Sequence, residues 1–360
     1  RRKVGGLFVG VTGSAGKSTV KEMAAGALSR TMPTASNGGN WNNHIGLPMS
    51  LMGMERDVRA GVFELGTNAP GEIARLAGIL TPEWGLVTNA GPAHLEAFGS
   101  VDAVVEEKGS LLANLPPQGR AFVNRDDRAF ERFVALASCR CVGVGLAENA
   151  DYYCVDREPE RNSFRVRESA TGDEADFTLG IPGEFNVRNA LMAIAVARSA
   201  GVEWDLIRSA LRDYRGLPMR WEVRSRGGVT LINDAYNANP ASMREAIRTL
   251  AEVYGGSRRW LVLGGMLELG RDARQEHRGL GEYIASGNWA GLITVGDQGR
   301  WIAEGAQSAG MSADGISVCG SAEEAAGVMK ERIAEGDAAL IKASRGIGLE
   351  RVLELLNERK

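Results

Sequence analysis

The chain has 360 residues, of which 44% are hydrophobic and 24% are charged, and its formal net charge is −3. This length predicts two domains, at residues 1–215 and 216–360, each able to bury its own core. A nearly balanced charge without basic blocks argues against nucleic acid and anionic membrane surfaces as partners, and no apolar run approaches the roughly 20 residues of a membrane span. Small soluble ligands are therefore expected.

The cysteines and the first residues indicate the compartment. The cysteines are Cys139, Cys141, Cys154 and Cys319, and none has the spacing of paired zinc ligands. We expect reduced thiols in a cytoplasmic protein. The opening sequence RRKVGGL has neither a signal segment nor an initiator Met, so the chain is expected to begin within a longer protein.

Short β-rich runs alternate with helical patterns in the first half, which is typical of a mostly parallel sheet covered by helices. The predicted elements are a strand at 7–11, a helix at 17–30, a strand at 61–65, a helix after 71 and a strand at 85–89. Between 152 and 179, strand pairs of alternating polarity predict an antiparallel flap on the same domain. Helices are predicted to follow at 187–200 and 204–214.

A second βα series follows a predicted linker at 215–218. Its strands are predicted within 229–235, 259–265, 291–296, 315–320 and 338–344, and its helices from 240, at 275–285, from 321 and at the end of the chain. The sequence therefore predicts two α/β domains.

The stretch GVTGSAGKST, residues 10–19, lies between a predicted strand and a predicted helix. A glycine-rich turn at this place directs backbone N–H groups and the positive end of the helix dipole toward one point, which suits a phosphate. Lys17 would reach the β- and γ-phosphates, and the Ser18 hydroxyl would coordinate Mg²⁺. Val11 stands where the strict Walker spacing has Gly, and the alternative is an ordinary glycine turn. The residues assigned to the nucleotide are Gly13, Ser14, Ala15, Gly16, Lys17, Ser18 and Thr19.

Residues that follow later strands could complete this site. Glu64 ends the strand GVFELG and His94 follows GLVTN, and ligands of open α/β sheets collect at the carboxyl ends of strands. Each could instead be an exposed side chain, and so could Lys108 in a helical segment. Taken as one set, Lys17, Ser18, Glu64 and His94 fit one or two Mg²⁺ ions that serve phosphoryl transfer.

An ordered series of motifs resembles the Mur ligase family of bacterial cell-wall synthesis over essentially the whole chain. The motifs are TGSAGKST, NWNNHIGLP, FELGTNAPGEI, NAGPAHLEAFGS with the trailing EEKGSLL, GEFNVRNAL, NDAYNANPASM, LGGMLELG and IKASRG. The resemblance implies a P-loop central ATPase domain and a C-terminal Rossmann-like α/β domain. It also implies that the family's N-terminal domain, which holds the UDP end of the substrate, is absent.

The same resemblance implies an ATP-dependent, ADP-forming ligase that makes an amide bond through an acyl phosphate. ELGTNAPGEI and YNANPASM are typical of family members that join D-alanyl-D-alanine to UDP-N-acetylmuramoyl-tripeptide for peptidoglycan synthesis. The resemblance further implies a monomer in the bacterial cytoplasm. Two alternatives remain. One is another amino-acid ligase of the superfamily, such as a folylpolyglutamate synthase or the ligase that adds the third stem residue. The other is a P-loop ATPase module without ligase activity.

The resemblance also implies roles for single residues near the metal and the adenine. Glu64 and His94 would hold Mg²⁺, and Lys108 matches a lysine that CO₂ carbamylates into an anionic ligand of the second metal or its shell. Asn189, with Asn186, would lie near the adenine and ribose. Phe185 stands where relatives commonly carry His.

The second domain is implied to supply further contacts. Arg220 would reach the γ-phosphate and Asp234 the ribose, so Lys17, Lys108, His94 and Arg220 form the expected catalytic set. Tyr236 and Asn239 complete the expected nucleotide contacts. The residues expected at the peptide or dipeptide substrate are Asn42, Asn43, His44, Asn237, Lys342, Ser344 and Arg345.

Overall fold

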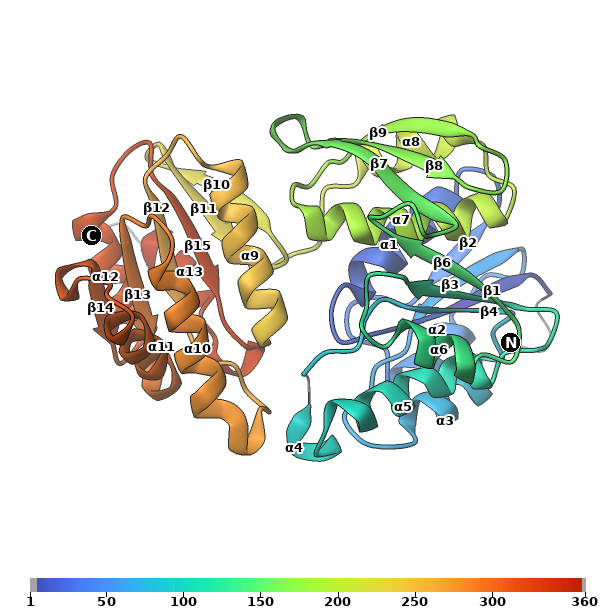
Figure 1. Cartoon of the computed structure of the whole chain (residues 1–360), viewed down its shortest axis with the longest axis horizontal. Coiled ribbons are helices and arrows are strands. Elements are labelled where there is room, and N and C mark those ends of the chain that lie inside the picture. The colour runs from blue at the N-terminus through green and yellow to red at the C-terminus, as the bar shows by residue number, and fades with distance from the viewer. Residues whose placement is uncertain (1–4, 93, 358–360) are drawn as a thin grey trace. The chain divides into compact units, whose positions relative to one another are not determined.

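The computed structural model describes residues 5–92 and 94–357. The chain divides into two compact units, of which the first ends at Arg215 and the second begins at Gly216 (Figure 1). Both units consist of helices packed on a mainly parallel sheet, which confirms the predicted α/β class.

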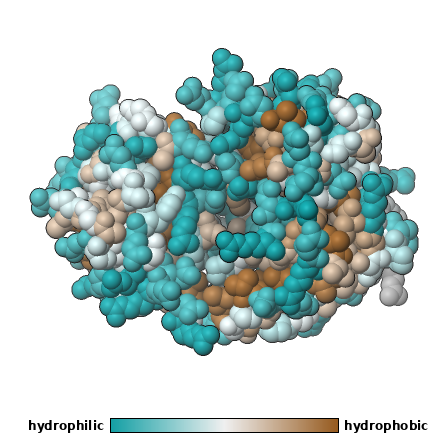
Figure 2. Space-filling view, viewed as in Figure 1, coloured by the Kyte–Doolittle hydropathy of each residue, from teal (hydrophilic) through white to brown (hydrophobic). Residues whose placement is uncertain are grey.

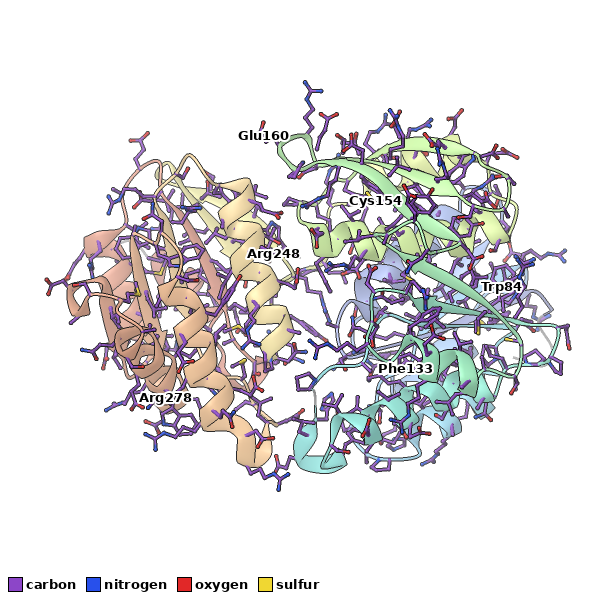
Figure 3. The ribbon with its side chains drawn as sticks, viewed as in Figure 1. Trp84, Phe133, Cys154, Glu160, Arg248 and Arg278 are labelled. Carbon is purple, nitrogen blue, oxygen red and sulfur yellow. The ribbon has the colours of Figure 1, made fainter. Side chains whose placement is uncertain are left out.

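The first unit contains a nine-stranded sheet in the order β2-β3-β1-β4-β5-β6-β7-β8-β9. In chain order its strands are β1 (Leu7–Thr12), β2 (Thr34–Ser36), β3 (Ala60–Glu64), β4 (Trp84–Val87), β5 (Arg120–Asn124), β6 (Arg140–Gly145), β7 (Tyr152–Glu158), β8 (Ser163–Glu168) and β9 (Glu174–Thr178). Pairing is parallel from β2 to β7 and antiparallel from β7 to β9. The predicted antiparallel flap is therefore a continuation of the same sheet, with Glu160 in the turn of its first hairpin (Figure 3).

Helices cover both faces of this sheet. They are α1 (Lys17–Leu28), α2 (Gly46–Met52), α3 (Glu72–Leu80), α4 (Leu95–Phe98), α5 (Val101–Ala113), α6 (Phe130–Leu136), α7 (Glu184–Ser199) and α8 (Trp204–Asp213). Successive residues of β1 point to opposite faces, because side chains alternate along a strand. Val9 and Val11 join a core with α1, α7 and α8, whereas Phe8 joins a core with α3 and α5.

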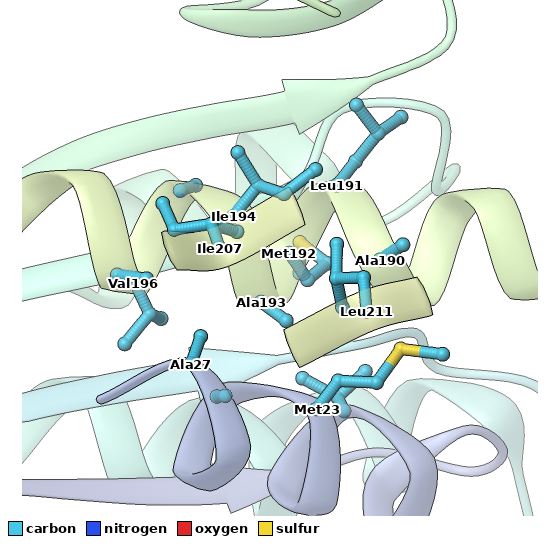
Figure 4. Packing of buried hydrophobic residues seen from close by; sticks show 14 of the residues in the cluster. Met23, Ala27, Ala190, Leu191, Met192, Ala193, Ile194, Val196, Ile207 and Leu211 are labelled. Atoms are coloured by element: carbon cyan, nitrogen blue, oxygen red, sulfur yellow. The ribbon is translucent and has the colours of Figure 1, made fainter. Parts of the chain in front are cut away.

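Helix α7 is buried along most of its length, from Val187 to Ala197. It packs against α1, and its alanines, among them Ala190 and Ala193, belong to the same core as Met23 and Ala27 of α1 (Figure 4). Small side chains allow close approach, and a helix that is apolar all round belongs inside a protein. This packing fixes the first turn of α7 relative to the first turn of α1.

The second unit contains a six-stranded sheet in the order β10-β11-β15-β12-β13-β14. Its strands are β10 (Glu222–Arg226), β11 (Val229–Asn233), β12 (Arg259–Leu263), β13 (Gly291–Val295), β14 (Ile316–Cys319) and β15 (Ala338–Lys342). Its helices are α9 (Pro240–Val253), α10 (Ala273–Ala285), α11 (Gly296–Ser308), α12 (Ala322–Arg332) and α13 (Arg351–Asn357). All pairs are parallel except the β10–β11 hairpin. Buried residues form one core on each face of the sheet, as in a Rossmann-like fold.

Hydrophilic side chains cover much of the visible surface, with smaller hydrophobic patches between them (Figure 2). The four cysteines are free thiols. Within the part of the chain that the structure describes, no helix has the length and apolar character needed to cross a bilayer.

Candidate active site

The glycine-rich loop between β1 and α1 is held in place by Asn89, which follows β4. The Asn89 side chain accepts a hydrogen bond from the Ala15 N–H at 2.9 Å and donates to the Ala15 carbonyl at 3.1 Å. The Asn89 carbonyl accepts from the Ser14 N–H at 3.0 Å. The first N–H groups of α1 have no intrahelical acceptor, and no side chain caps this helix. The loop therefore presents an ordered set of donors that suits an anion.

Glycine is required at two positions of this loop. Gly13 and Gly16 have φ angles of 152° and 81°, which L side chains rarely adopt. A Cβ at Gly13 would lie 1.8 Å from the Thr88 hydroxyl oxygen, and one at Gly16 would lie 2.4 Å from Asn189 Oδ1. The close approach of Asn189 brings the first turn of α7 to the phosphate-binding loop.

The two functional side chains at the start of α1 have different partners. The ammonium of Lys17 donates to the Gly13 carbonyl at 2.8 Å, so the side chain folds back over the loop. The hydroxyl of Ser18, which is buried, donates to Oε2 of Glu64 at 2.5 Å. The sequence predicted both the loop and Glu64, and the structure brings them together.

Glu64 is held by two asparagines. Asn42 donates to Oε1 of Glu64 at 2.8 Å. The Asn37 side chain accepts from the Glu64 N–H at 2.8 Å and donates to the Glu64 carbonyl at 2.9 Å, so it continues the strand pairing at the end of β3. A Cβ at Gly66 would lie 2.7 Å from Asn42 Cγ, so glycine allows Asn42 to approach. Both oxygens of Glu64 are therefore oriented by the protein.

Lys108 lies in α5 with its side chain almost fully buried, at 2% exposure. Burial, together with the positive charge of Lys17, lowers the pKa of Lys108 to about 7, although Glu107 opposes this change. No hydrogen bond or ion pair reaches its ammonium from residues 5–92 or 94–357. Glu107 itself accepts from the N–H groups of Gly71 and Ile73, at 2.6 and 2.7 Å, and so caps the start of α3. Lys108 is thus a buried amine without a partner of its own, and it lies close enough to Lys17 to sense its charge.

His94 immediately precedes α4, with a left-handed φ of 55°, and its side chain is half-buried. Ala93 lies outside the described residues. No three His, Cys, Asp or Glu side chains of the described ranges form a cluster that could hold a metal. Mg²⁺ takes only one or two carboxylate ligands and completes its shell with water and phosphate oxygens. The Ser18 hydroxyl and Glu64 carboxylate are therefore a donor set that fits Mg²⁺.

Three residues that the sequence analysis assigned to the nucleotide region lie at the start of α7. The Asn186 side chain donates to the Pro182 carbonyl at 2.6 Å and accepts from Asn189 Nδ2 at 3.3 Å. A Cβ at Gly16 would lie 3.2 Å from the Phe185 ring. Phe185 and Asn189 thus line the loop, while Asn186 fixes the orientation of Asn189.

In the second unit, Arg220 lies beside the start of the β10–β11 hairpin. Its guanidinium stacks over the Tyr236 ring at 4.1 Å. The residues on either side, Met219 and Trp221, both have left-handed φ angles, of 59° and 55°. Such conformations cost energy in non-glycine residues and occur where the surrounding structure imposes them. The backbone around Arg220 is thus held in a fixed, strained arrangement.

Asp234 and Lys342 form an ion pair at the ends of β11 and β15. Lys342 Nζ lies 2.7 Å from Asp234 Oδ2 and also donates to the Asn237 carbonyl at 2.9 Å. Its side chain is 4% exposed. Asp234 Oδ1 accepts from the Trp221 N–H at 3.1 Å. Lys342 therefore supports the loop that carries Asp234 and Asn237.

The other predicted residues of this unit have local partners as well. The buried Ser344 hydroxyl accepts from the Leu267 N–H at 2.9 Å and donates to the Ala238 carbonyl at 3.1 Å. Asn239 forms a capping box with Ser242 at the start of α9. Arg345 is exposed and pairs with Glu350 at 2.9 Å. In the first unit, the Asn43 side chain accepts from the Ile45 and Gly46 N–H groups, at 3.1 and 2.9 Å, at the start of α2.

Sequence reasoning did not find Asn37, Asn89, Glu107 or Asp127. Asp127 is half-buried, desolvation raises its pKa, and its carboxylate accepts from the Ala90 and Ala129 N–H groups at 2.8 Å each. Asn89 could have been found, because polar residues after a buried strand belong to the ligand-binding edge of the sheet. Asn37 carries no such signal, because its partner Glu64 lies 27 residues away.

A P-loop at the carboxyl ends of a parallel sheet, followed by a Rossmann-like unit, defines a two-unit P-loop protein of the α/β class. Residues 11–197 match the model of the Mur ligase middle domain, and residues 219–345 match that of the Mur ligase, glutamate ligase domain. The chain belongs to the Mur ligase family.

Two similar ligases share one name. The UDP-N-acetylmuramoyl-tripeptide--D-alanyl-D-alanine ligase of Bacillus subtilis is 33% identical, over 99% of this chain and 77% of its own length. The Escherichia coli enzyme of the same name is 33% identical, over 99% of this chain and 78% of its own length. Among solved structures, MurF from Acinetobacter baumannii superposes with a TM-score of 0.89 at 29% identity, over 98% of this chain and 77% of that one. MurF ligase from Thermotoga maritima in complex with ADP superposes with a TM-score of 0.87 at 28% identity, over 98% of this chain and 80% of that one.

Proposed function

We propose that this protein joins D-alanyl-D-alanine to UDP-N-acetylmuramoyl-tripeptide in an ATP-dependent reaction that yields ADP, phosphate and an amide bond. The reaction would supply a peptidoglycan precursor in the bacterial cytoplasm. The likeness to several ligases of this name over almost the whole chain supports the substrates. The observation that carries the chemistry is the Ser18–Glu64 contact at the end of the phosphate-binding loop.

The chemical problem is that a carboxylate does not acylate an amine until one of its oxygens becomes a good leaving group. In the first step, an oxygen of the tripeptide's terminal carboxylate attacks the γ-phosphorus of ATP, and ADP leaves. In the second step, the amine of D-alanyl-D-alanine attacks the carbonyl carbon. The bridging oxygen then leaves with the phosphate, and the amine loses a proton.

The residues of the first unit address the charge of the first step, in which two anions must meet. The N–H groups at the start of α1 and the ammonium of Lys17 would bind the phosphates and offset this repulsion. Ser18 and Glu64 would hold Mg²⁺, with His94 as a further ligand. When bound, Mg²⁺ neutralises charge on the phosphate oxygens and orients them. Phe185, Asn186 and Asn189 would lie at the nucleoside end.

Lys108 is proposed to react with CO₂ and become a carbamate. The neutral amine is the form that adds CO₂, and a pKa of about 7 leaves a large fraction of Lys108 neutral at neutral pH. The Lys108 amine has no hydrogen-bond partner among the described residues, which supports the proposal that it reacts with CO₂ and then binds a metal ion. Carbamylation would turn a buried cation into an anion, which could ligate a second Mg²⁺.

The remaining predicted residues keep their proposed roles. Arg220 would contact the γ-phosphate. The stacking of its guanidinium on Tyr236 limits the rotamers of Arg220 and so helps to orient it. Three other residues are proposed to bind the nucleotide, directly or through the loops that they hold: Asp234, Tyr236 and Asn239. Seven are proposed to bind the peptide substrates in the same two ways: Asn42, Asn43, His44, Asn237, Lys342, Ser344 and Arg345.

The experiment is mass spectrometry of the products formed from ATP, Mg²⁺, D-alanyl-D-alanine and the UDP-muramoyl tripeptide. The expected product is the UDP-muramoyl pentapeptide, formed with one ADP per amide bond. Lys17→Ala is the negative control, because it removes the cation of the loop. ATP hydrolysis without any pentapeptide would favour a P-loop ATPase without ligase activity. A product made only with a different amino-acid substrate would favour another ligase of the superfamily.

A further inference from the structure

Two buried polar side chains of the first unit have no hydrogen-bond partner among the described residues. One is Thr12 at the end of β1, whose hydroxyl is fully buried. The other is Lys108 in α5, whose side chain is almost fully buried. Burying a polar group without a partner costs free energy, so most buried polar groups in proteins are hydrogen-bonded. Each of these exceptions therefore calls for an explanation.

Thr12 points toward α5. Side chains alternate along a strand, so Thr12 shares one face of β1 with Gly10 and Phe8. Phe8 belongs to the core with α3 and α5, and a Cβ at Gly10 would lie 3.1 Å from Cδ1 of Leu111 in α5. Thr12 comes two residues after Gly10. Its side chain therefore lies on the α5 side of the sheet, nearer the carboxyl ends of the strands.

Lys108 approaches the same place from α5. This helix connects β4 to β5, which pair in parallel, so it runs antiparallel to the strands. Lys108 precedes Leu111 by about one turn and therefore lies nearer the carboxyl ends than the contact of Leu111 with Gly10. Side chains of a helix tilt toward its N-terminus, which carries the ammonium further in that direction. The electrostatic interaction of Lys108 with Lys17 supports this placement. The Thr12 hydroxyl and the Lys108 ammonium thus face the same part of the interior, without a hydrogen bond between them.

A carbamate on Lys108 would supply the partner that Thr12 lacks. The lone pair of the neutral Nζ forms a bond to the carbon of CO₂, one carbon–oxygen π bond breaks, and the nitrogen loses one proton to water. An amine is thereby replaced by a group with two acceptor oxygens and one negative charge. A hydroxyl can donate one hydrogen bond, and hydrogen bonds to charged oxygens are stronger than those between neutral groups.

We propose that the Thr12 hydroxyl donates a hydrogen bond to one oxygen of the Lys108 carbamate and thereby stabilises it. This inference rests on the proposed function. Thr12 is a positioning residue, because it orients the carbamate and leaves the other oxygen for Mg²⁺. The cost of burying an unpaired hydroxyl is present only in the unmodified protein, which shifts the equilibrium toward the carbamate.

The test measures how much bicarbonate the protein needs to form the carbamate. The carbamate signal is followed by ¹³C NMR in titrations with ¹³C-bicarbonate, without ATP. Thr12→Val keeps the shape of the side chain and removes the hydroxyl. It should need at least about tenfold more bicarbonate, which is the effect of losing one hydrogen bond to a charged group. Thr12→Ser keeps the hydroxyl and should stay close to the wild type.

The matched control is Thr294→Val in β13 of the second unit. Thr294 is also fully buried, and its hydroxyl has no partner in the part of the chain that the structure describes. Thr294→Val therefore makes the same chemical change far from Lys108 in the sequence and in a different core. It should leave the bicarbonate titration unchanged.

Two further readouts separate this role from a merely structural one. Without bicarbonate, Thr12→Val should be at least as stable as the wild type in thermal denaturation, because the hydroxyl that it removes has no partner there. Ligation by Thr12→Val should be slow at low bicarbonate and should recover at high bicarbonate. A defect in folding or packing would not be repaired in this way.

Three results would overturn the inference while leaving the ligase function standing. They are an unchanged bicarbonate requirement in Thr12→Val, an equal increase in Thr294→Val, and a Thr12→Val protein that is less stable than the wild type without bicarbonate. If the wild type forms no carbamate, the proposed role of Lys108 fails and the inference fails with it. The mass of the ligation product decides the ligase function separately.

Discussion

The hydroxyl of Ser18 donates a 2.5 Å hydrogen bond to the carboxylate of Glu64, which lies 46 residues away in the sequence. This contact joins the first turn of α1 to the end of β3. The two are close because α1 follows β1, and β1 pairs with β3 in the sheet. Asn42 orients the other carboxylate oxygen. The oxygen ligands proposed for Mg²⁺ are therefore positioned by the protein before any ligand binds, which lowers the cost of assembling the site.

The charge of Glu64 is expected to be essential for turnover. Glu64→Gln keeps the size of the side chain and its ability to accept from Ser18, but it removes the negative charge that attracts a cation. We expect ligation to fall by about 100-fold or more, in line with the loss of one electrostatic contact to the transition state. Steady-state kinetics over a range of Mg²⁺ concentrations measures this effect. If Glu64→Gln turned over as fast as the wild type at low Mg²⁺, Glu64 would not be a ligand of the metal.

Asn37 is expected to act as a positioning residue for Glu64. Asn37→Ala leaves the buried N–H and carbonyl of Glu64 without partners, which costs roughly 1–3 kcal/mol in the free energy of unfolding. Ligation should show a lower kcat and a need for more Mg²⁺. Asn40→Ala is the control, because the Asn40 side chain is exposed, and it should change neither property. Equal behaviour of the two variants in denaturation and kinetics would contradict this role.

Gly16 is expected to tolerate no side chain. Gly16→Ala would place a methyl group 2.4 Å from Asn189 Oδ1 and would demand a left-handed φ of 81° from alanine. We expect a loss of ATP affinity of at least tenfold by calorimetry. Gly26→Ala in the same helix has no atom within 4 Å of the new Cβ, so it should keep the affinity and raise stability by about 0.5–1 kcal/mol. Unchanged ATP binding in Gly16→Ala would show that the loop moves away from this geometry.

Lys108 is expected to be needed for ligation but not for nucleotide binding. Lys108→Ala should abolish turnover and leave ATP binding largely intact, and short-chain carboxylates with bicarbonate should partly restore the activity. With ¹³C-bicarbonate, NMR should show a carbamate signal in the wild type that Lys108→Ala lacks. The neutral amine reacts, and its pKa is lowered to about 7, so carbamylation should weaken as the pH falls below 7. A fully active Lys108→Ala protein would exclude this role.

His277 should make the second unit less stable in acid. Its Nε2 accepts from the Met266 N–H at 2.8 Å, so this nitrogen must be unprotonated in the folded state. Burial lowers the pKa of His277, while the hydrogen bond to the Ala273 carbonyl opposes the change. The unfolded chain, with an ordinary pKa of about 6.5, therefore binds the proton more readily, and stability is lost as the pH falls below that value. Thermal denaturation between pH 7 and pH 5 should show a smaller decline in His277→Leu than in the wild type.

The α/β class and the phosphate-binding loop were predictable because both depend on local patterns. The βα alternation predicted strands near the observed β1, β3 and β4, and the glycine, lysine and hydroxyl order predicted the start of α1. The predicted helix at 17–30 ends two residues early, at Leu28. Glu64 and Asn189 were found because the first ends a strand and the second lies in a family motif.

The parts that could not be predicted depend on contacts between distant segments. Asn37 and Glu107 act on backbone groups 27 to 36 residues away, and no local pattern marks them. Lys108 reads from the sequence as an exposed helical lysine, and only the packing of α5 shows that it is buried. Lys342 was expected to contact a substrate, yet its ammonium holds Asp234 and Asn237, because the ends of β11 and β15 are neighbours in the sheet.

The most direct test of the central claim follows the oxygen atoms of the tripeptide's terminal carboxylate. The substrate is labelled with ¹⁸O in both carboxylate oxygens and incubated with the protein, ATP, Mg²⁺ and D-alanyl-D-alanine, and the released phosphate is analysed by mass spectrometry. An acyl phosphate intermediate predicts one ¹⁸O atom in each phosphate released and one retained in the new amide. Unlabelled phosphate, formed while ATP is consumed, would contradict carboxylate activation by this protein.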